Sequence, residues 1–99
     1  MGVHKFSDGS KYDGLWKDGM RSGLGIYNFP RKRIRYQGGW RMDKYHGKGC
    51  LTDGNGEKYD GEWRFGLREG QGKFYWRNGA WYEGGWKGDQ MRPKMPPTN

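Results

Sequence analysis

The chain carries apolar and polar positions in a short, regular pattern rather than in long apolar runs. The motif Y-x-G-x-W occurs four times, beginning at residues 12, 36, 59 and 82, and a G-x-G pair follows the first three copies at a constant distance. The motif starts are 24, 23 and 23 residues apart. Self-similarity at such a period indicates a repeat protein. We therefore interpret the chain as about four linked repeats.

Asx-Gly pairs separate the alternating segments inside the repeats. They are Asp8-Gly9, Asn55-Gly56 and Asn78-Gly79, at one aligned position of segments 2–16, 49–63 and 72–86. Such a pair between alternating segments is a strong hairpin signal. In segment 25–40 the run Pro30–Arg33 takes this place, so we expect a longer, basic tip there. The sequence thus predicts four β-hairpins, or eight strands.

Strand alternation places the Tyr, Gly and Trp of each motif on one face, because side chains at i, i+2 and i+4 point the same way. The preceding strands add Tyr27, Leu51 and Phe74 to that face. The opposite face carries charges of both signs, such as Lys58 and Asp60, which compensate one another. We expect that second face to be solvated.

Composition limits the core that these strands can build. Ile, Leu, Val and Phe make up 11 of 99 residues and the mean hydropathy is −1.29, which disfavours a conventional globular enzyme. Yet 17% of the residues are aromatic and twenty are glycine. Aromatic side chains have large areas to bury and are scarce in disordered chains. We therefore expect an ordered chain.

Charge and cysteine content narrow the setting. The single Cys50 excludes an internal disulfide and a cysteine-based zinc site, so we expect a reducing, cytoplasmic location. No apolar run reaches the roughly twenty residues of a membrane span, and the N-terminus lacks a signal-type apolar stretch. The net charge of +8 favours acidic partners. Nucleic acid is disfavoured, because the basic columns are interleaved with acids.

The four motifs with their trailing G-x-G resemble MORN repeats (membrane occupation and recognition nexus) over about residues 2–89. The resemblance implies an all-β fold, a single-layer antiparallel meander of about four β-hairpins, elongated and curved, with the motif rings lining a groove. The sequence departs from the pattern at Asp53, where a ring is expected, and at Pro93, which takes a usual glycine position. We expect a repeat domain over 1–89 and a Pro-rich, extended or disordered tail over 90–99.

An aromatic face that no second layer covers is expected to bind a partner helix or peptide. The candidate groove residues are Tyr12, Trp16, Tyr36, Trp40, Tyr59, Trp63, Trp76, Tyr82 and Trp86. The alternative is that the motif rings only pack on one another, which leaves Phe65, Trp76 and Trp81 freer to face a partner.

Two other surfaces offer contacts. The basic patch comprises Arg31, Lys32, Arg33 and Arg35, and it either meets an acidic protein surface or anionic lipid or is a solvated turn. Both ends of the sheet have open edges, available for end-to-end association between copies. Lys5, Arg77 and Lys87 lie near these edges and favour protection against such pairing.

Catalytic residues are few. His4 and His46 are far apart in the sequence, His46 in an expected inter-repeat loop, and Cys50 has no evident base. Segment 66–73 lacks the spacing of a phosphate loop, and segment 53–57 lacks the later ligands of a calcium loop. We expect no enzyme activity, no cofactor and no metal.

The resulting functional hypothesis is a structural adaptor that joins protein partners in a larger cytoplasmic assembly. The resemblance to MORN repeats implies a cytoskeletal setting, including ciliary and flagellar axonemes. The alternative is a peripheral membrane module that binds anionic phospholipid through basic residues.

Overall fold

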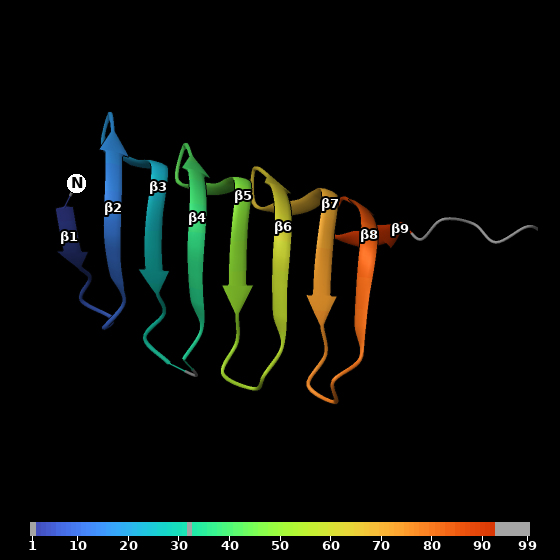
Figure 1. Ribbon diagram of the computed structural model, residues 1–99. Helices are drawn as coiled ribbons and strands as arrows, with labels where there is room; N and C mark the ends of the chain where they lie inside the picture. Colours follow the sequence, from blue (N-terminus) through green and yellow to red (C-terminus); the bar gives the residue numbers. More distant parts are fainter. Residues whose placement is uncertain (1, 32, 93–99) are drawn as a thin grey trace, which may run out of the picture.

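The computed structural model describes residues 2–31 and 33–92, which form one open antiparallel sheet of nine strands in chain order (Figure 1). The strands are β1 (Gly2–Lys5), β2 (Lys11–Lys17), β3 (Met20–Asn28), β4 (Arg35–Arg41), β5 (Lys44–Thr52), β6 (Lys58–Arg64), β7 (Leu67–Tyr75), β8 (Trp81–Lys87) and β9 (Gln90–Arg92). The predicted all-β, single-layer meander is confirmed. The described residues contain no helix, and hence none long and apolar enough to cross a membrane.

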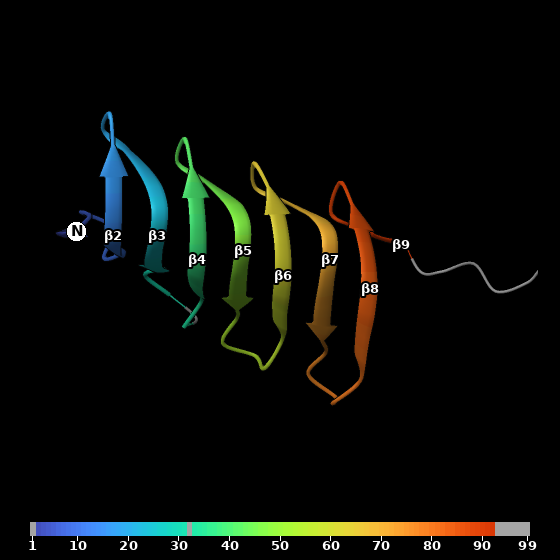
Figure 2. The ribbon, with the colours of Figure 1, turned by 45° about the horizontal axis from the view of Figure 1, so that its top comes forward.

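Two kinds of turn alternate along the chain, one at each end of the strands (Figure 2). At one end of the strands lie the loops with the predicted Asx-Gly pairs, and the loop between β3 and β4 is one residue longer than the other three, as expected. At the other end of the strands lie two-residue turns with positive φ at both positions. These are Asp18-Gly19, Met42-Asp43, Phe65-Gly66 and Gly88-Asp89. Positive φ at both positions is the geometry of a type I′ turn, whose twist matches that of paired strands.

The strand register aligns tyrosines and glycines in rows across the sheet. One row runs through His4, Tyr12, Tyr27, Tyr36, Leu51, Tyr59, Phe74 and Tyr82. The next row on the same face is Gly2, Gly14, Gly25, Gly38, Gly49, Gly61, Gly72 and Gly84. A Cβ atom at Gly49 would overlap the phenol of Tyr36. The glycine row is therefore needed because the tyrosine rings lie across it.

The core is a continuous stack of the motif rings. Each of the first three motif tyrosines lies between the tryptophan of its own repeat and that of the next, whereas Tyr82 contacts only Trp86 among the described tryptophans. The Tyr36 ring, for example, is 5.1 Å from Trp40 and 5.7 Å from Trp63, nearly perpendicular to both. Tyr12 and Tyr59 repeat this arrangement. The core thus extends along the sheet, and each repeat is stabilised by its neighbours.

The sheet continues past the boundary that we expected at Asp89. Gln90–Arg92 form β9 and pair with Gly85–Lys87, which gives nine strands instead of eight. Gly88 and Asp89 supply the positive-φ turn, and the first proline of the tail comes only at position 93, so the backbone amides of residues 90–92 remain available for pairing. The rest of the predicted tail, 93–99, lies outside the described residues.

His46 also differs from its expected place in a loop. It lies in β5, because the chain already reverses at Met42-Asp43, and the strand resumes at Lys44.

Candidate interaction surfaces

Six of the nine residues predicted to line a partner groove are buried in the stack of rings. They are Tyr12, Tyr36, Trp40, Tyr59, Trp63 and Trp86. Trp16 is 40% exposed, and Trp76 and Tyr82 are half-buried. The structure therefore brings the motif rings together as predicted, but mainly against one another.

The polar atoms of the buried rings are bonded within the sheet. The indole N–H groups of Trp40, Trp63 and Trp86 donate to the carbonyls of Gly25, Gly49 and Gly72 at 3.1, 3.0 and 3.2 Å. The phenols of Tyr12, Tyr36 and Tyr59 donate to backbone carbonyls three residues further on. Burial raises the pKa of Tyr59 to about 12. These groups hold the sheet together and are not available to anchor a partner.

A side chain from the preceding repeat covers each buried tryptophan. The covering pairs are Arg21 on Trp40 (4.7 Å), Tyr45 on Trp63 (5.0 Å) and Arg68 on Trp86 (4.6 Å). Asp43 holds Arg21 at 2.8 Å, and Asp89 holds Arg68 at 3.1 Å. The backbone amide of Arg21 also donates to Asp43, and together with the guanidinium it lowers the pKa of that carboxyl. The sequence analysis predicted neither the two Arg–Asp ion pairs nor the role of Tyr45, because the type of the covering residue changes from repeat to repeat.

Two neighbouring grooves on the aromatic face meet at Tyr45 and Gly66. The first, of about 340 Å³, is lined by Arg21, Tyr27, Phe29, Trp40, Asp43 and Lys44. The second, of about 350 Å³, is lined by Leu51, Asp53, Glu57, Lys58, Tyr59, Trp63, Arg68, Phe74 and Asp89. Their apolar walls include Tyr27, Leu51 and Phe74, the half-buried side chains that alternate with the motif tyrosines in one row.

A larger groove, of about 470 Å³, lies on the opposite face, which we predicted to be solvated. It is lined by Asp13, Leu24, Ile26, Gln37, Lys48, Cys50 and Asp60 above three glycines. The strand register is irregular beside this glycine row, between Gly14 and Trp16 and again between Gly38 and Trp40. Such irregularities bend strands, and a period-two pattern does not reveal them.

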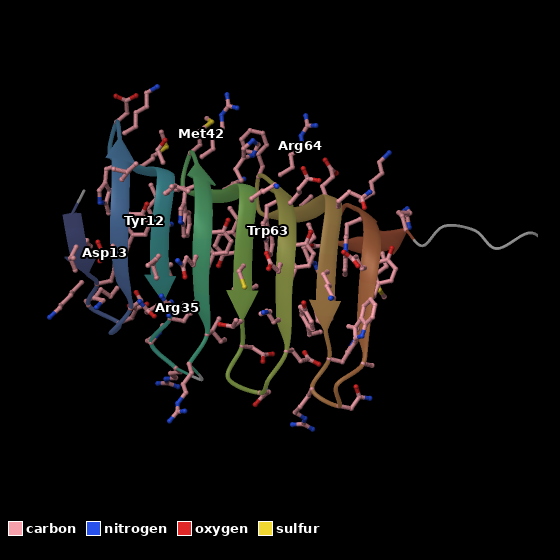
Figure 3. The ribbon with its side chains drawn as sticks, in the orientation of Figure 1. Tyr12, Asp13, Arg35, Met42, Trp63 and Arg64 are labelled. Carbon is pink, nitrogen blue, oxygen red and sulfur yellow. The ribbon has the colours of Figure 1, made fainter. Side chains whose placement is uncertain are left out.

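The basic patch lies in the loop between β3 and β4 and at the start of β4, at the end of the strands where the longer loops are. Arg31, Arg33 and Arg35 are exposed, and Lys32 lies outside the described residues. Figure 3 places Arg35 at the opposite end of the strands from Met42 and Arg64. No described carboxylate forms an ion pair with these three arginines, so their charge faces solvent.

The residues considered for catalysis or metal binding have structural partners. Burial raises the pKa of the Cys50 thiol, which opposes formation of the reactive thiolate. His46 accepts a hydrogen bond from the Phe65 amide at 3.2 Å, and Asp53 accepts those of Asn55 and Glu57 within its loop. Over residues 2–31 and 33–92, no three His, Cys, Asp or Glu side chains gather as metal ligands would.

Parts of known proteins are similar to this chain. The chain is 35% identical over 60 residues to alsin from mouse (Mus musculus), and the match to alsin from chimpanzee (Pan troglodytes) and human (Homo sapiens) is equally long and equally identical. The matched region covers 57% of this chain but 4% of each alsin, so the chain spans a small fraction of these relatives. The MORN repeat model matches residues 12–31, 36–58, 59–81 and 82–92. Each match begins at a motif tyrosine and together they cover most of the sheet, so the chain belongs to the MORN repeat family.

Proposed function

We propose that this chain is a non-catalytic scaffold that holds an apolar helix or peptide of a partner protein on its aromatic face. MORN repeats are modules for interaction with proteins or membranes, and proteins built from them are generally non-catalytic. The observation that supports the proposal is the pair of grooves that meet at Tyr45, left uncovered by any second layer of the described residues.

The side chains that would meet the partner differ from the tryptophans favoured by the sequence. Trp40 and Trp63 line the grooves but are only 5 and 6% exposed, and the buried Trp86 lines neither groove. Tyr27, Leu51 and Phe74 are half-buried beside them and are the apolar groups that a partner would cover. Burial of such a row against an amphipathic segment is the usual helix-in-groove mode of recognition.

Photo-crosslinking in the native cytoplasm tests the proposal with matched positions. A photoreactive amino acid at Leu51 or Phe74 reports on the aromatic face, whereas the same group at Cys50 or Lys73 lies one residue away and on the opposite face. We expect the same protein to be captured from Leu51 and Phe74 and not from the two control positions. Equal capture from both faces, or no capture at all, would contradict the proposal.

The rival function is recruitment to anionic membranes through the basic patch. The observation in its favour is that Arg31, Arg33 and Arg35 are exposed together at one end of the strands, without carboxylate partners among the described residues. Co-sedimentation with phosphoinositide vesicles at physiological salt separates the two. Binding that is lost in the triple variant Arg31→Ala, Lys32→Ala, Arg33→Ala would favour the membrane function.

The proposed assembly is cytoplasmic and cytoskeletal, with the axoneme of a cilium or flagellum as its specific setting. This part rests on the resemblance of the motifs to MORN repeats. Fractionation of ciliated cells tests it, since the protein should remain with detergent-washed axonemes and not with the soluble or membrane fraction.

A further inference from the structure

The first tryptophan of the array lacks what the other three have. Trp40, Trp63 and Trp86 each have a covering side chain from the preceding repeat and are 5 or 6% exposed. Trp16 has the same place in its motif and packs on Tyr12 at 5.0 Å, but it is 40% exposed. Its ring meets His4 edge-on at 6.0 Å, and no described side chain takes the position over it that Arg21, Tyr45 and Arg68 take over the later tryptophans.

The missing cover has a counterpart at the other end of the same chain. The covering residues Tyr45 and Arg68 are 23 positions apart, and the next step of 23 reaches Met91 in β9. Met91 is also 40% exposed, and no described tryptophan lies under it as Trp86 lies under Arg68. Methionine packs well against aromatic rings. One end of the array therefore offers an uncovered ring, and the other end offers a side chain in the covering position.

The strand edges match in the same way. In each interior odd-numbered strand, one four-residue segment pairs with both neighbouring strands. In β7 this segment is Gly72–Tyr75, which pairs with Lys58–Gly61 and with Trp81–Gly84. β1 carries the equivalent residues, Gly2–Lys5, and β2 is its only partner among the described strands. In the described part of the chain, Trp81–Gly84 of β8 pair with β7 alone, since β9 occupies only Gly85–Lys87.

We propose that the chain binds a second copy of itself head to tail, with β1 of one copy added to Trp81–Gly84 of the other. The interior register fixes the pairs: Gly2 opposite Gly84, Val3 opposite Glu83, His4 opposite Tyr82, and Lys5 opposite Trp81. In this arrangement Met91 of one copy covers Trp16 of the next, and Tyr82 receives the tryptophan edge that its counterparts have. The contact deepens the scaffold function but does not depend on the aromatic grooves.

Charge and exposed apolar area agree with this contact. Lys5 would lie beside Trp81 and diagonal to Glu83, so the lysine at this edge is compatible with pairing. Within the described residues, the exposed large apolar side chains gather at the two ends of the sheet. Those in the two outer strands at each end are Val3, Leu15, Trp16, Trp81 and Met91, and the remainder are Leu24, Met42, Phe65 and Leu67.

The two surfaces are different, so the contact is heterologous. A heterologous contact that does not close generates open chains of copies rather than dimers. The aromatic stack would then run without interruption from one copy into the next.

Site-specific disulfide crosslinking tests the register. Every chain carries Cys50→Ser, one population carries Val3→Cys, and the other carries Glu83→Cys. Opposite residues of antiparallel strands have Cα atoms about 4.5–5.5 Å apart, within the reach of a disulfide. We expect the mixture to yield the mixed disulfide dimer under mild oxidation.

A matched control replaces Glu83→Cys by Lys87→Cys, on the same face of β8 but about 13 Å further along the strand. This pair should yield little product. Predominant Val3→Cys homodimers would show symmetric pairing of β1 edges and overturn the proposal, as would equal yields with either β8 cysteine.

Sedimentation equilibrium of the 99-residue chain tests the ring contact. We expect the average mass to rise with concentration beyond that of a dimer, and Met91→Asp to weaken association about tenfold or more. Leu24→Asp is the control, because Leu24 is 70% exposed but lies in the interior strand β3. A chain that stays monomeric at every concentration, or equal weakening by the two variants, would overturn the proposal. Circular dichroism of each variant checks that the sheet is intact.

Discussion

The central repeats and the first repeat carry the same Y-x-G-x-W motif, yet their tryptophans have different environments. Trp63 is 6% exposed, covered by Tyr45, and donates its indole N–H to Gly49. Trp16 is 40% exposed. The difference comes from the neighbours, because the cover of Trp63 lies in β5 ahead of Gly49, whereas β1 is described only from Gly2, the equivalent of Gly49. In a one-dimensional array the motif specifies a residue's place, and the adjacent repeats determine its stability.

The largest test of this comparison is the pair Trp63→Ala and Trp16→Ala. Removal of a buried tryptophan leaves a cavity and an unpaired carbonyl, so Trp63→Ala should lower the free energy of unfolding by about 3–5 kcal/mol. Because Trp16 is half-exposed, Trp16→Ala should lower the free energy of unfolding by only about 1 kcal/mol. Urea unfolding of the dilute chain measures both. Equal losses would mean that the end repeat is packed as tightly as the centre.

A second pair of variants probes the glycine row. Gly49→Ala places a methyl group against the Tyr36 phenol, so the ring must move and the free energy of unfolding should fall by about 1–3 kcal/mol. Gly2 belongs to the same row, but its added Cβ would meet no atom within 4 Å. Gly2→Ala should therefore change stability by less than about 0.5 kcal/mol. The same denaturation curves decide, and a damaging Gly2→Ala would contradict the contrast.

A third prediction concerns pH and the middle of the stack. Burial raises the pKa of Tyr45 to about 12, above the value of about 10 for an unfolded tyrosine. The folded chain therefore favours the neutral phenol, and its contribution to stability is complete below about pH 10 and is lost as pH rises to about 12. Thermal melting should show a decline over that window, and Tyr45→Phe should reduce the decline while it keeps the ring. An unchanged decline in Tyr45→Phe would remove Tyr45 as the cause.

Most of the fold follows from the sequence because each repeat encodes its own hairpin. The motif spacing gave the sheet, the ring face and the longer tip at Pro30. The sequence left open whether the rings face a partner or pack on one another, because periodicity assigns a side chain to a face but not the neighbour that covers it. Tyr45 shows the reason: it performs the task of Arg21 and Arg68 with a different chemistry, so no repeated letter marks it. The groove beside Cys50 was missed because it depends on strand bending.

The smallest expected effect separates the central turns from those at the ends. Phe65 has φ 45° in a turn whose equivalents in the outer repeats are Asp18 and Gly88, residues that tolerate this conformation better. Phe65→Asn should relieve the backbone and raise the free energy of unfolding by about 0.5 kcal/mol, whereas Asp18→Asn should leave it unchanged. Urea unfolding of both variants against the parent chain measures the difference. The Phe65 ring also lies 4.6 Å from His46, so a loss of stability in Phe65→Asn would show that ring packing outweighs the backbone strain.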